Sequence, residues 1–173
     1  LLNTNATSFL MLGEGIMGLE ASISSLVEKN DRVLVIYNGF FGEGFADYVN
    51  SYGGTAFKYK DDFRNGINIQ KLEKFLESDH NFQIATMVHC ETPSGITNNI
   101  KEICTLLKKY NILTIVDSVS AMGGEYINFD DFNIDVLLGG SQKCISAPVG
   151  LSLVTISDAA KEKIENRKED IRS

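Results

Sequence analysis

The stretch Ile134-Asp135-Val136-Leu137-Leu138-Gly139-Gly140-Ser141-Gln142-Lys143 contains the pattern that decides the fold. Its first half is an apolar run and predicts a buried strand over residues 134–138. Its second half predicts a glycine-rich turn with a lysine just past the strand end. A strand that is apolar along its whole length is typical of a parallel sheet with helices on both faces. A lysine is seldom placed in such a turn without a reason.

The same alternation of apolar runs and amphipathic stretches continues along all 173 residues. It predicts one α/β domain over residues 1–173, a three-layer α/β/α sandwich with a mostly parallel sheet. Surface loops are expected at 60–66 and 128–133. The predicted strands cover residues 8–12, 32–37, 53–60, 84–89, 112–117, 134–138 and 151–156, and the predicted helices cover 16–27, 45–52, 69–76, 99–110 and 158–173.

Composition excludes several classes of function. Sixteen Lys and Arg against 23 Asp and Glu give a net charge of −7, which argues against binding to nucleic acid or to an anionic membrane surface. No apolar run reaches the ~18 residues of a membrane span. The three cysteines form no CxxC pair, and no His/Cys cluster has metal-ligand spacing, so we expect no metal site and a reducing cytoplasm.

Chemically useful residues follow five of the predicted strands. Ligands of open α/β sheets bind outside the carboxyl ends of the strands, so these segments are expected to converge. They offer a glycine turn at a helix start, which suits a phosphate, together with an aromatic ring, a carboxylate and a lysine. The segments are Gly13–Gly18, Asn38–Gly42, Cys90–Gly95, Asp117–Ser120 and Gly139–Lys143.

The glycine turn also matches the pattern GxGxxG at Gly13, Gly15 and Gly18. A dinucleotide site would add an acid at the end of the next strand, but that strand ends in Tyr37-Asn38. A nicotinamide-dependent oxidoreductase therefore remains a remote alternative. A non-catalytic binding or assembly domain is a second one.

Five segments in order resemble the class V aminotransferase family, which belongs to fold type I of the pyridoxal-phosphate enzymes. They are GEGIMGLEA (13–21), NGFFGE (38–43), HCETPSG (89–95), VDSVSAMGG (116–124) and GSQK (140–143). Within the family, GSQKCISAPVGL is most similar to alanine–glyoxylate and serine–pyruvate aminotransferases. MVHCET is also similar to the 2-aminoethylphosphonate–pyruvate branch.

The resemblance implies a role for each residue at these strand ends. Lys143 would form the Schiff base with pyridoxal 5'-phosphate and carry protons, and Asp117 would pair with the pyridine nitrogen. Phe41, expected in a loop between glycines, would stack on one ring face, with Val119 on the other. Further cofactor contacts are expected from Thr92 at the ring oxygen, from Gln142 at the phosphate or ring, and from the phosphate turn at Glu14, Gly15 and Ile16.

Two residues depart from the family pattern. Val149 stands where a second proline is usual, and Glu14 stands where a serine is common. Neither change removes a chemical role, because the backbone at Glu14 can still donate to a phosphate. The Glu14 carboxylate is nevertheless placed near that phosphate, so we expect it to point away or to meet a cation.

The resemblance also implies the reaction and the assembly. Transamination is expected between a small amino acid of the alanine or serine type and a small oxo acid such as glyoxylate or pyruvate. We expect a homodimer with the site at the subunit interface. Residues 1–173 would then be an incomplete large domain, inactive by itself. Alternatives are the 2-aminoethylphosphonate–pyruvate reaction and a lyase or cysteine desulfurase, although desulfurases usually carry histidine where Gln142 stands.

Overall fold

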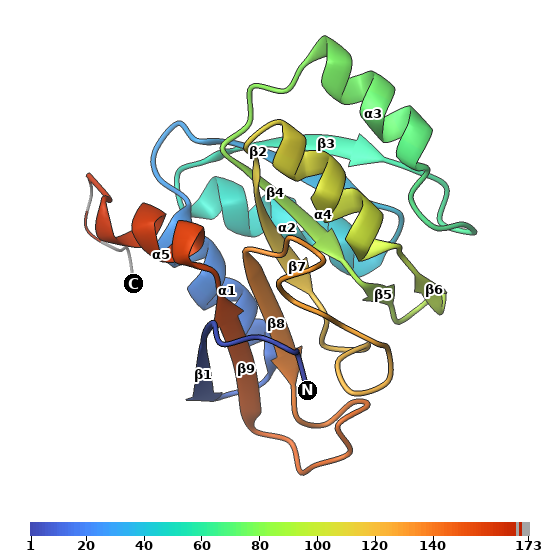
Figure 1. Cartoon of the computed structure of the whole chain (residues 1–173), viewed down its shortest axis with the longest axis vertical. Coiled ribbons are helices and arrows are strands. Elements are labelled where there is room, and N and C mark those ends of the chain that lie inside the picture. Colours follow the sequence, from blue (N-terminus) through green and yellow to red (C-terminus); the bar gives the residue numbers. More distant parts are fainter. Residues whose placement is uncertain (169, 171–173) are drawn as a thin grey trace.

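A seven-stranded sheet forms the centre of the part of the chain that the computed structural model describes, residues 1–168 and 170 (Figure 1). The strands lie in the order β1-β9-β8-β7-β4-β2-β3. They are β1 (Thr7–Leu12), β2 (Arg32–Tyr37), β3 (Thr55–Lys60), β4 (Ile84–Val88), β7 (Leu113–Asp117), β8 (Val136–Gly140) and β9 (Leu151–Ile156). The helices are α1 (Gly15–Leu26), α2 (Phe40–Ser51), α3 (Ile69–Ser78), α4 (Ile100–Lys109) and α5 (Asp158–Glu165).

The sheet is mainly parallel, as the apolar strands predict. The five neighbours β3, β2, β4, β7 and β8 run in one direction. β9 pairs antiparallel with β8, and β1 pairs antiparallel with β9, so β1 points the same way as the central strands. The carboxyl ends of six strands therefore lie along one edge of the sheet.

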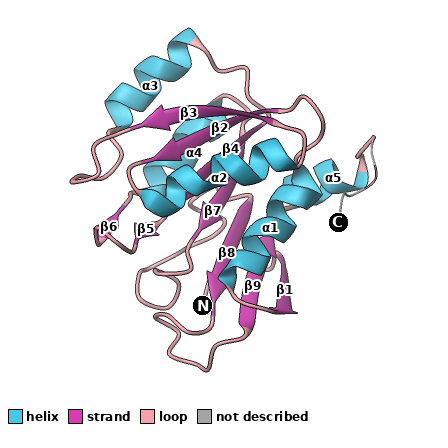
Figure 2. Cartoon of the chain, turned by 180° about the vertical axis from the view of Figure 1, so that it is seen from behind, coloured by secondary structure: helices cyan, strands magenta, loops and turns pink. Residues whose placement is uncertain are grey.

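Helices cover both faces of the sheet. α3 and α4 lie on one face, and α1, α2 and α5 lie on the other, which the two opposite views show (Figures 1 and 2). Alternate residues of β2 enter the two cores: Leu34 packs toward α3 and α4, whereas Val33 and Val35 pack toward α1 and α2. Because both faces are buried, these strands are apolar throughout, and the predicted three-layer sandwich is confirmed.

Three helices are capped by the side chain of their own N-cap residue and two are not. Asn68, Asn99 and Ser157 accept hydrogen bonds from backbone N–H groups in the first turns of α3, α4 and α5. Glu14 and Gly39 precede α1 and α2 without capping them through a side chain. The first N–H groups of α1 and α2 thus depend on partners other than their own N-cap side chains.

Two predicted boundaries are wrong. α2 begins at Phe40 instead of 45, so Phe41 lies in the first turn of a helix and not in a loop. β8 extends through Gly139 and Gly140, which we predicted to form a turn. Their role is close packing, because a Cβ on Gly139 would lie 2.5 Å from the sulfur of Met122.

Smaller differences concern the connections and the carboxyl-terminal end. A two-stranded hairpin that the sequence pattern did not predict, β5 (Cys90–Glu91) and β6 (Ile96–Thr97), follows β4. α5 ends at Glu165, short of the predicted 173, and residues 169 and 171–173 lie outside the described residues. The predicted loops at 60–66 and 128–133 are confirmed, apart from Lys60, which ends β3.

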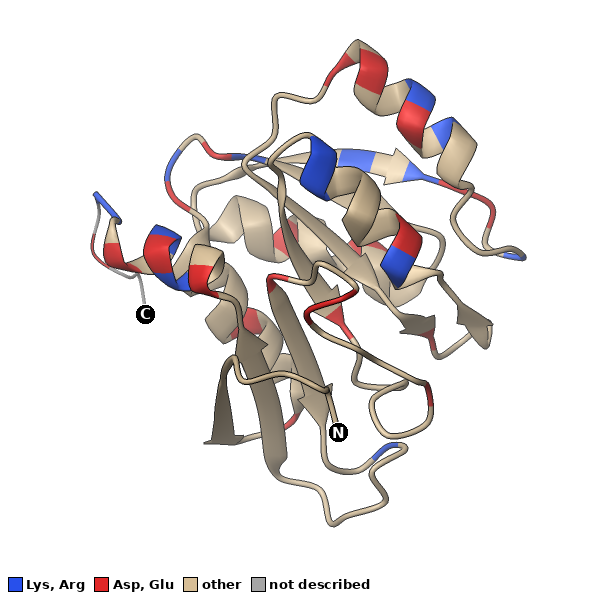
Figure 3. Cartoon of the chain, in the orientation of Figure 1, with Lys and Arg blue, Asp and Glu red and all other residues tan. Residues whose placement is uncertain are grey.

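Charged residues are frequent along α3, α4 and α5, whereas the loops near the carboxyl ends of β7 and β8 carry few (Figure 3). None of the described helices combines the length and the low polarity that crossing a bilayer requires.

Candidate active site

A cleft of about 260 Å³ opens at the carboxyl ends of β4, β7 and β8, beside the first turns of α1 and α2. Every residue that the sequence singled out for a site lines this cleft. Four further lining residues were not predicted: Leu19, Val88, Cys90 and Ser120. The nine predicted residues are Glu14, Gly15, Ile16, Phe41, Thr92, Asp117, Val119, Gln142 and Lys143.

Lys143 lies in the turn that follows β8, at the mouth of the cleft. Ser141 holds the base of this turn, because its hydroxyl donates to the carbonyl of Pro148 at 2.6 Å and its carbonyl accepts from the N–H of Ala147 at 3.0 Å. The side-chain amine of Lys143 makes no ion pair or hydrogen bond within the described residues. It is therefore available to a ligand in the cleft.

Asp117 ends β7 and is 9% exposed. One carboxylate oxygen accepts from the backbone N–H of Val119 at 2.9 Å. Burial raises the pKa of Asp117 to about 6; the Val119 hydrogen bond opposes this rise, and the charge of Glu91 adds to it. A buried carboxylate with this environment favours a cationic ligand, which would repay the cost of ionising it.

This burial gives the ligand-free protein a pH-dependent stability. The folded pKa of Asp117 exceeds its ordinary value of 3.8, so its contribution to stability is fully present below about pH 4 and is lost as the pH rises through 6. Asp117→Asn should therefore raise the free energy of unfolding by on the order of 3 kcal/mol at pH 8 and by less than about 1 kcal/mol at pH 4. Urea titrations of both proteins across this range measure the difference. If the difference in free energy of unfolding between the two proteins did not change with pH, the raised pKa of Asp117 would be contradicted.

Glu91 fixes the start of α2. It is fully buried, and its two carboxylate oxygens accept from the N–H of Phe41 at 3.1 Å and of Gly42 at 2.6 Å. A Cβ on Gly39 would lie 2.5 Å from the Glu91 carboxyl carbon, so glycine is needed there for space. Glu91 thus caps the helix that carries Phe41 into the cleft.

Removing the Glu91 carboxylate should weaken this region strongly. Glu91→Ala leaves the buried N–H of Gly42 and the partly buried N–H of Phe41 without an acceptor and should lower the free energy of unfolding by about 3 kcal/mol. Glu91→Gln keeps one acceptor oxygen and should cost less. The matched control is Glu43→Ala on the outer side of α2, where only a surface ion pair with Lys58 is lost and under about 1 kcal/mol is expected. If urea unfolding showed equal losses of free energy for Glu91→Ala and Glu43→Ala, Glu91 would not stabilise the start of α2 as a cap.

The walls of the cleft suit a flat ring with polar substituents. Phe41 is 45% exposed at one side, and Val119 packs so closely on Gly15 that a Cβ there would lie 2.5 Å from it. Thr92 and Ser120 share a hydrogen bond of 2.5 Å between their hydroxyls at the rim. The side-chain oxygen of Gln142 is buried and has no partner within the described residues. Such an oxygen needs a donor, and a ligand in the cleft would supply one.

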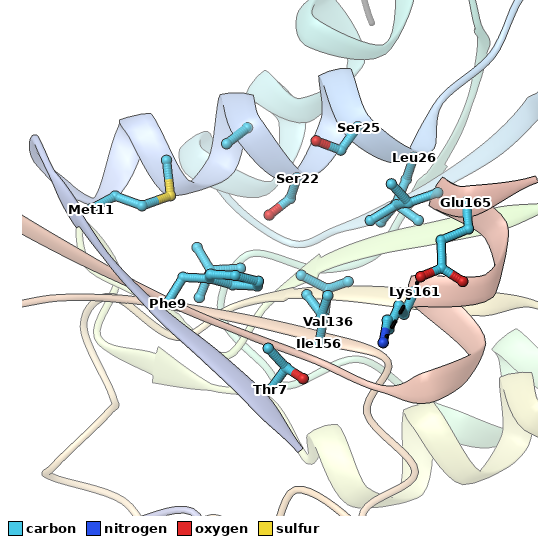
Figure 4. A pocket seen from close by; sticks show the side chains of 13 residues that line it. Thr7, Phe9, Met11, Ser22, Ser25, Leu26, Val136, Ile156, Lys161 and Glu165 are labelled. Carbon is cyan, nitrogen blue, oxygen red and sulfur yellow. Dashed lines mark ion pairs between the residues drawn. The ribbon is translucent and has the colours of Figure 1, made fainter. Parts of the chain in front are cut away.

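A second cavity, of about 460 Å³, lies between α1, β1, β9 and α5 (Figure 4). Apolar side chains such as Phe9, Met11 and Ile156 line most of it. Its charged residues, Lys161 and Glu165, form an ion pair of 3.8 Å with each other. This cavity offers no free charged group for chemistry, so the smaller cleft is the candidate active site.

Comparisons with known proteins agree with this geometry. The family model for class V aminotransferases matches residues 16–169. An uncharacterized aminotransferase of Methanocaldococcus jannaschii is 38% identical over 168 residues, which are 97% of this chain and 44% of that protein. A 2-aminoethylphosphonate–pyruvate transaminase of Bacillus cereus is 34% identical over 148 residues, 86% of this chain and 43% of that protein.

A solved structure has nearly the same fold. The alanine–glyoxylate aminotransferase of Nostoc sp. superposes with a TM-score of 0.94 at 27% identity, covering 99% of this chain and 46% of that one. The chain thus spans less than half the length of the relatives it matches. The family match covers most of the described residues, and the chain belongs to the class V aminotransferases.

Proposed function

We propose that this protein transfers an amino group from a small amino acid to a small oxo acid with pyridoxal 5'-phosphate as cofactor. Class V aminotransferases depend on this cofactor. The observation that carries the proposal is the meeting of Lys143 and Asp117 in one cleft with the uncapped start of α1. Nicotinamide chemistry has no comparable support, since the acid that would hold its ribose is missing.

The residues of the cleft fit the ring of the cofactor. We assign Phe41 and Val119, which both line the cleft, to its two faces, and the buried Asp117 carboxylate to the protonated pyridine nitrogen. Lys143 supplies the amine for the aldehyde. The unpaired oxygen of Gln142 and the rim hydroxyl of Thr92 are available for the polar substituents.

In the reaction, each of these side chains has a task that follows from its chemistry. The bound cofactor supplies an electron sink for the charge that develops at the substrate carbon. The buried Asp117 carboxylate would hold the proton on the ring nitrogen. Lys143 would supply the amine that holds the cofactor through its aldehyde, and its Nζ would act as the general base and acid that moves the proton during the transfer.

The proposal also covers the substrates, the domain and the assembly of the protein. We infer that the donor is alanine or serine and the acceptor glyoxylate or pyruvate. Residues 1–173 would form the cofactor-binding large domain of a cytoplasmic homodimer and be inactive alone. Similarity to the alanine–glyoxylate enzyme over 99% of the chain supports the substrate class. The 2-aminoethylphosphonate–pyruvate reaction is the second candidate, because that relative is 34% identical.

An assay with the purified full-length protein separates these candidates, because residues 1–173 are expected to be inactive alone. Alanine, serine and 2-aminoethylphosphonate are offered as donors, each with glyoxylate or pyruvate, and Lys143→Ala serves as the blank. Transfer from alanine or serine supports the main proposal, and transfer from 2-aminoethylphosphonate alone supports the second. Pyridoxal bound to Lys143 without any amine transfer would indicate a lyase or desulfurase. Absence of a Lys143 adduct after borohydride would refute the proposal as a whole.

A further inference from the structure

A buried histidine outside the cleft is bonded to the turn that carries Asp117. His89 directly follows β4, and its Nδ1 lies 3.0 Å from the hydroxyl of Ser118, which is itself fully buried. The Ser118 hydroxyl has no other side-chain partner within the described residues. His89 does not line the cleft, and it lines instead a separate cavity of about 340 Å³ beside the start of α4. The imidazole is therefore not placed to contact a ligand in the cleft.

The contact between His89 and Ser118 joins two neutral groups. Burial lowers the pKa of His89 to about 4, so the ring carries no charge at neutral pH. A neutral imidazole has one N–H donor and one acceptor nitrogen, and a hydroxyl can take either part, so the pair is satisfied in both tautomers. Without the imidazole, the Ser118 hydroxyl would be buried with no side-chain partner. Such a group costs free energy, and the chain around it would shift to relieve that cost.

Ser118 is the residue at which β7 passes into the loop of the cleft. Its neighbours on both sides, Asp117 and Val119, line the cleft, whereas Ser118 does not. Backbone bonds fix the strand end: the N–H of His89 donates to the Asp117 carbonyl at 2.7 Å, and the N–H of Ser118 donates to the Leu138 carbonyl at 2.8 Å. One residue further on, the N–H of Val119 donates to the Asp117 carboxylate at 2.9 Å. The Ser118 hydroxyl thus anchors a turn whose two cleft residues are bonded to each other.

We infer that His89 is a positioning residue for the cleft, and that it fixes the direction of the Asp117 carboxylate and the place of Val119 through Ser118. The inference rests on the proposed function, which assigns Asp117 to the ring nitrogen and Val119 to one ring face. A displacement of about 1 Å in such groups can cost roughly a hundredfold in rate. His89 itself takes no part in proton transfer.

Hydrogen exchange in the ligand-free full-length protein tests the positioning without any assay of activity. His89→Phe keeps a flat ring and removes both nitrogens. The N–H of Val119 should then exchange at least about tenfold faster, because its acceptor on Asp117 is no longer held in place. Mass spectrometry of a peptide that contains residues 117–120 measures this change. Exchange in β2 should stay as in the wild type, whereas a general loss of stability would speed both.

Variants matched to the two ring nitrogens show which contact matters. Asn places a polar atom near the position of Nδ1, so His89→Asn should keep the bond to Ser118, whereas Gln places its amide near Nε2, so His89→Gln should behave like His89→Phe. Ser118→Ala removes the other partner and should match His89→Phe, and the double variant should lose nothing further. Ser118→Ala also carries the test if His89→Phe folds poorly. His80→Phe is the control, because the other histidine bonds to the Leu76 carbonyl outside the cleft.

The full-length protein loaded with pyridoxal 5'-phosphate supplies the second measurement. His89→Phe and Ser118→Ala should lower kcat at least about tenfold and change KM for the amino acid less than about threefold, because Asp117 acts on the ring and not on substrate binding. His89→Asn should recover most of the rate.

Three results would overturn the inference and leave the proposed function standing. They are an unchanged kcat in the folded variants, an unchanged exchange rate at Val119, and equal losses in His89→Asn and His89→Phe. Wild-type protein that carries no cofactor on Lys143 after borohydride reduction would overturn the proposed function and the inference with it.

Discussion

Lys143→Ala is expected to abolish covalent attachment of pyridoxal and to reduce amine transfer by at least about a thousandfold. The substitution removes both the amine that bonds to the aldehyde and the group that carries the proton, and a general base alone contributes 10²–10⁴ in rate. The fold should be unaffected, because the Lys143 side chain is exposed and unpaired within the described residues. Loss of amine transfer with an unchanged free energy of unfolding would show that Lys143 acts in the reaction and does not stabilise the fold.

The measurement is mass spectrometry of peptides after borohydride reduction, together with urea unfolding of both proteins. Lys29→Ala is a suitable control, since Lys29 is also exposed but lies in the loop after α1, away from the cleft. A pyridoxal adduct on a lysine other than Lys143 would show that the wrong residue has been assigned.

The second large effect is expected for Asp117→Asn. An uncharged amide cannot hold the proton on the ring nitrogen, and loss of a buried ionic partner typically costs ~3–5 kcal/mol. If this cost falls on the transition state, the rate of proton abstraction falls by roughly two to four powers of ten. Cofactor binding should weaken less, because the contacts proposed for Phe41, Val119 and Lys143 do not depend on Asp117.

Single-turnover absorbance measurements separate the two effects by reporting binding and proton transfer independently. Asp62→Asn, which alters a half-buried carboxylate that pairs with Arg64 outside the cleft, provides the control. If Asp117→Asn retained a rate within about threefold of wild type, Asp117 would serve only to hold the turn through the N–H of Val119.

The type of every main strand and helix was predictable because local pattern and tertiary environment agree. Val33 to Ile36 are apolar on both faces, and both faces are buried. Asn99 and Ser157 are good helix caps, and helices begin directly after them. The start of α2 was missed because Gly39 and Gly42 suggest a loop by themselves. In the structure Gly39 makes room for the Glu91 side chain, and Gly42 makes room for Tyr37 and Glu91.

The site was predictable to the extent that it depends on strand ends. Parallel strands bring their carboxyl ends to one edge, so the segments at Gly15, Thr92, Asp117 and Lys143 meet in the cleft. The part played by Glu91 could not be found in this way. Its partners, Phe41 and Gly42, lie about fifty residues away, and no local pattern shows that a carboxylate will cap a distant helix.

The pairing of β1 with β9 has a consequence for the order of folding. Thr7 lies opposite Ile156, so this pairing brings together segments from the two ends of the chain, and the N–H of Gly13 donates to the carbonyl of Gly150 across the same junction. Closing so long a loop costs more entropy than forming the strand–helix–strand units between them. We therefore expect the central strands to bring Lys143 and Asp117 together before β1 and the start of α1 join them. A ligand that binds the cleft only when β1 is paired with β9 would then stabilise that pairing by mass action.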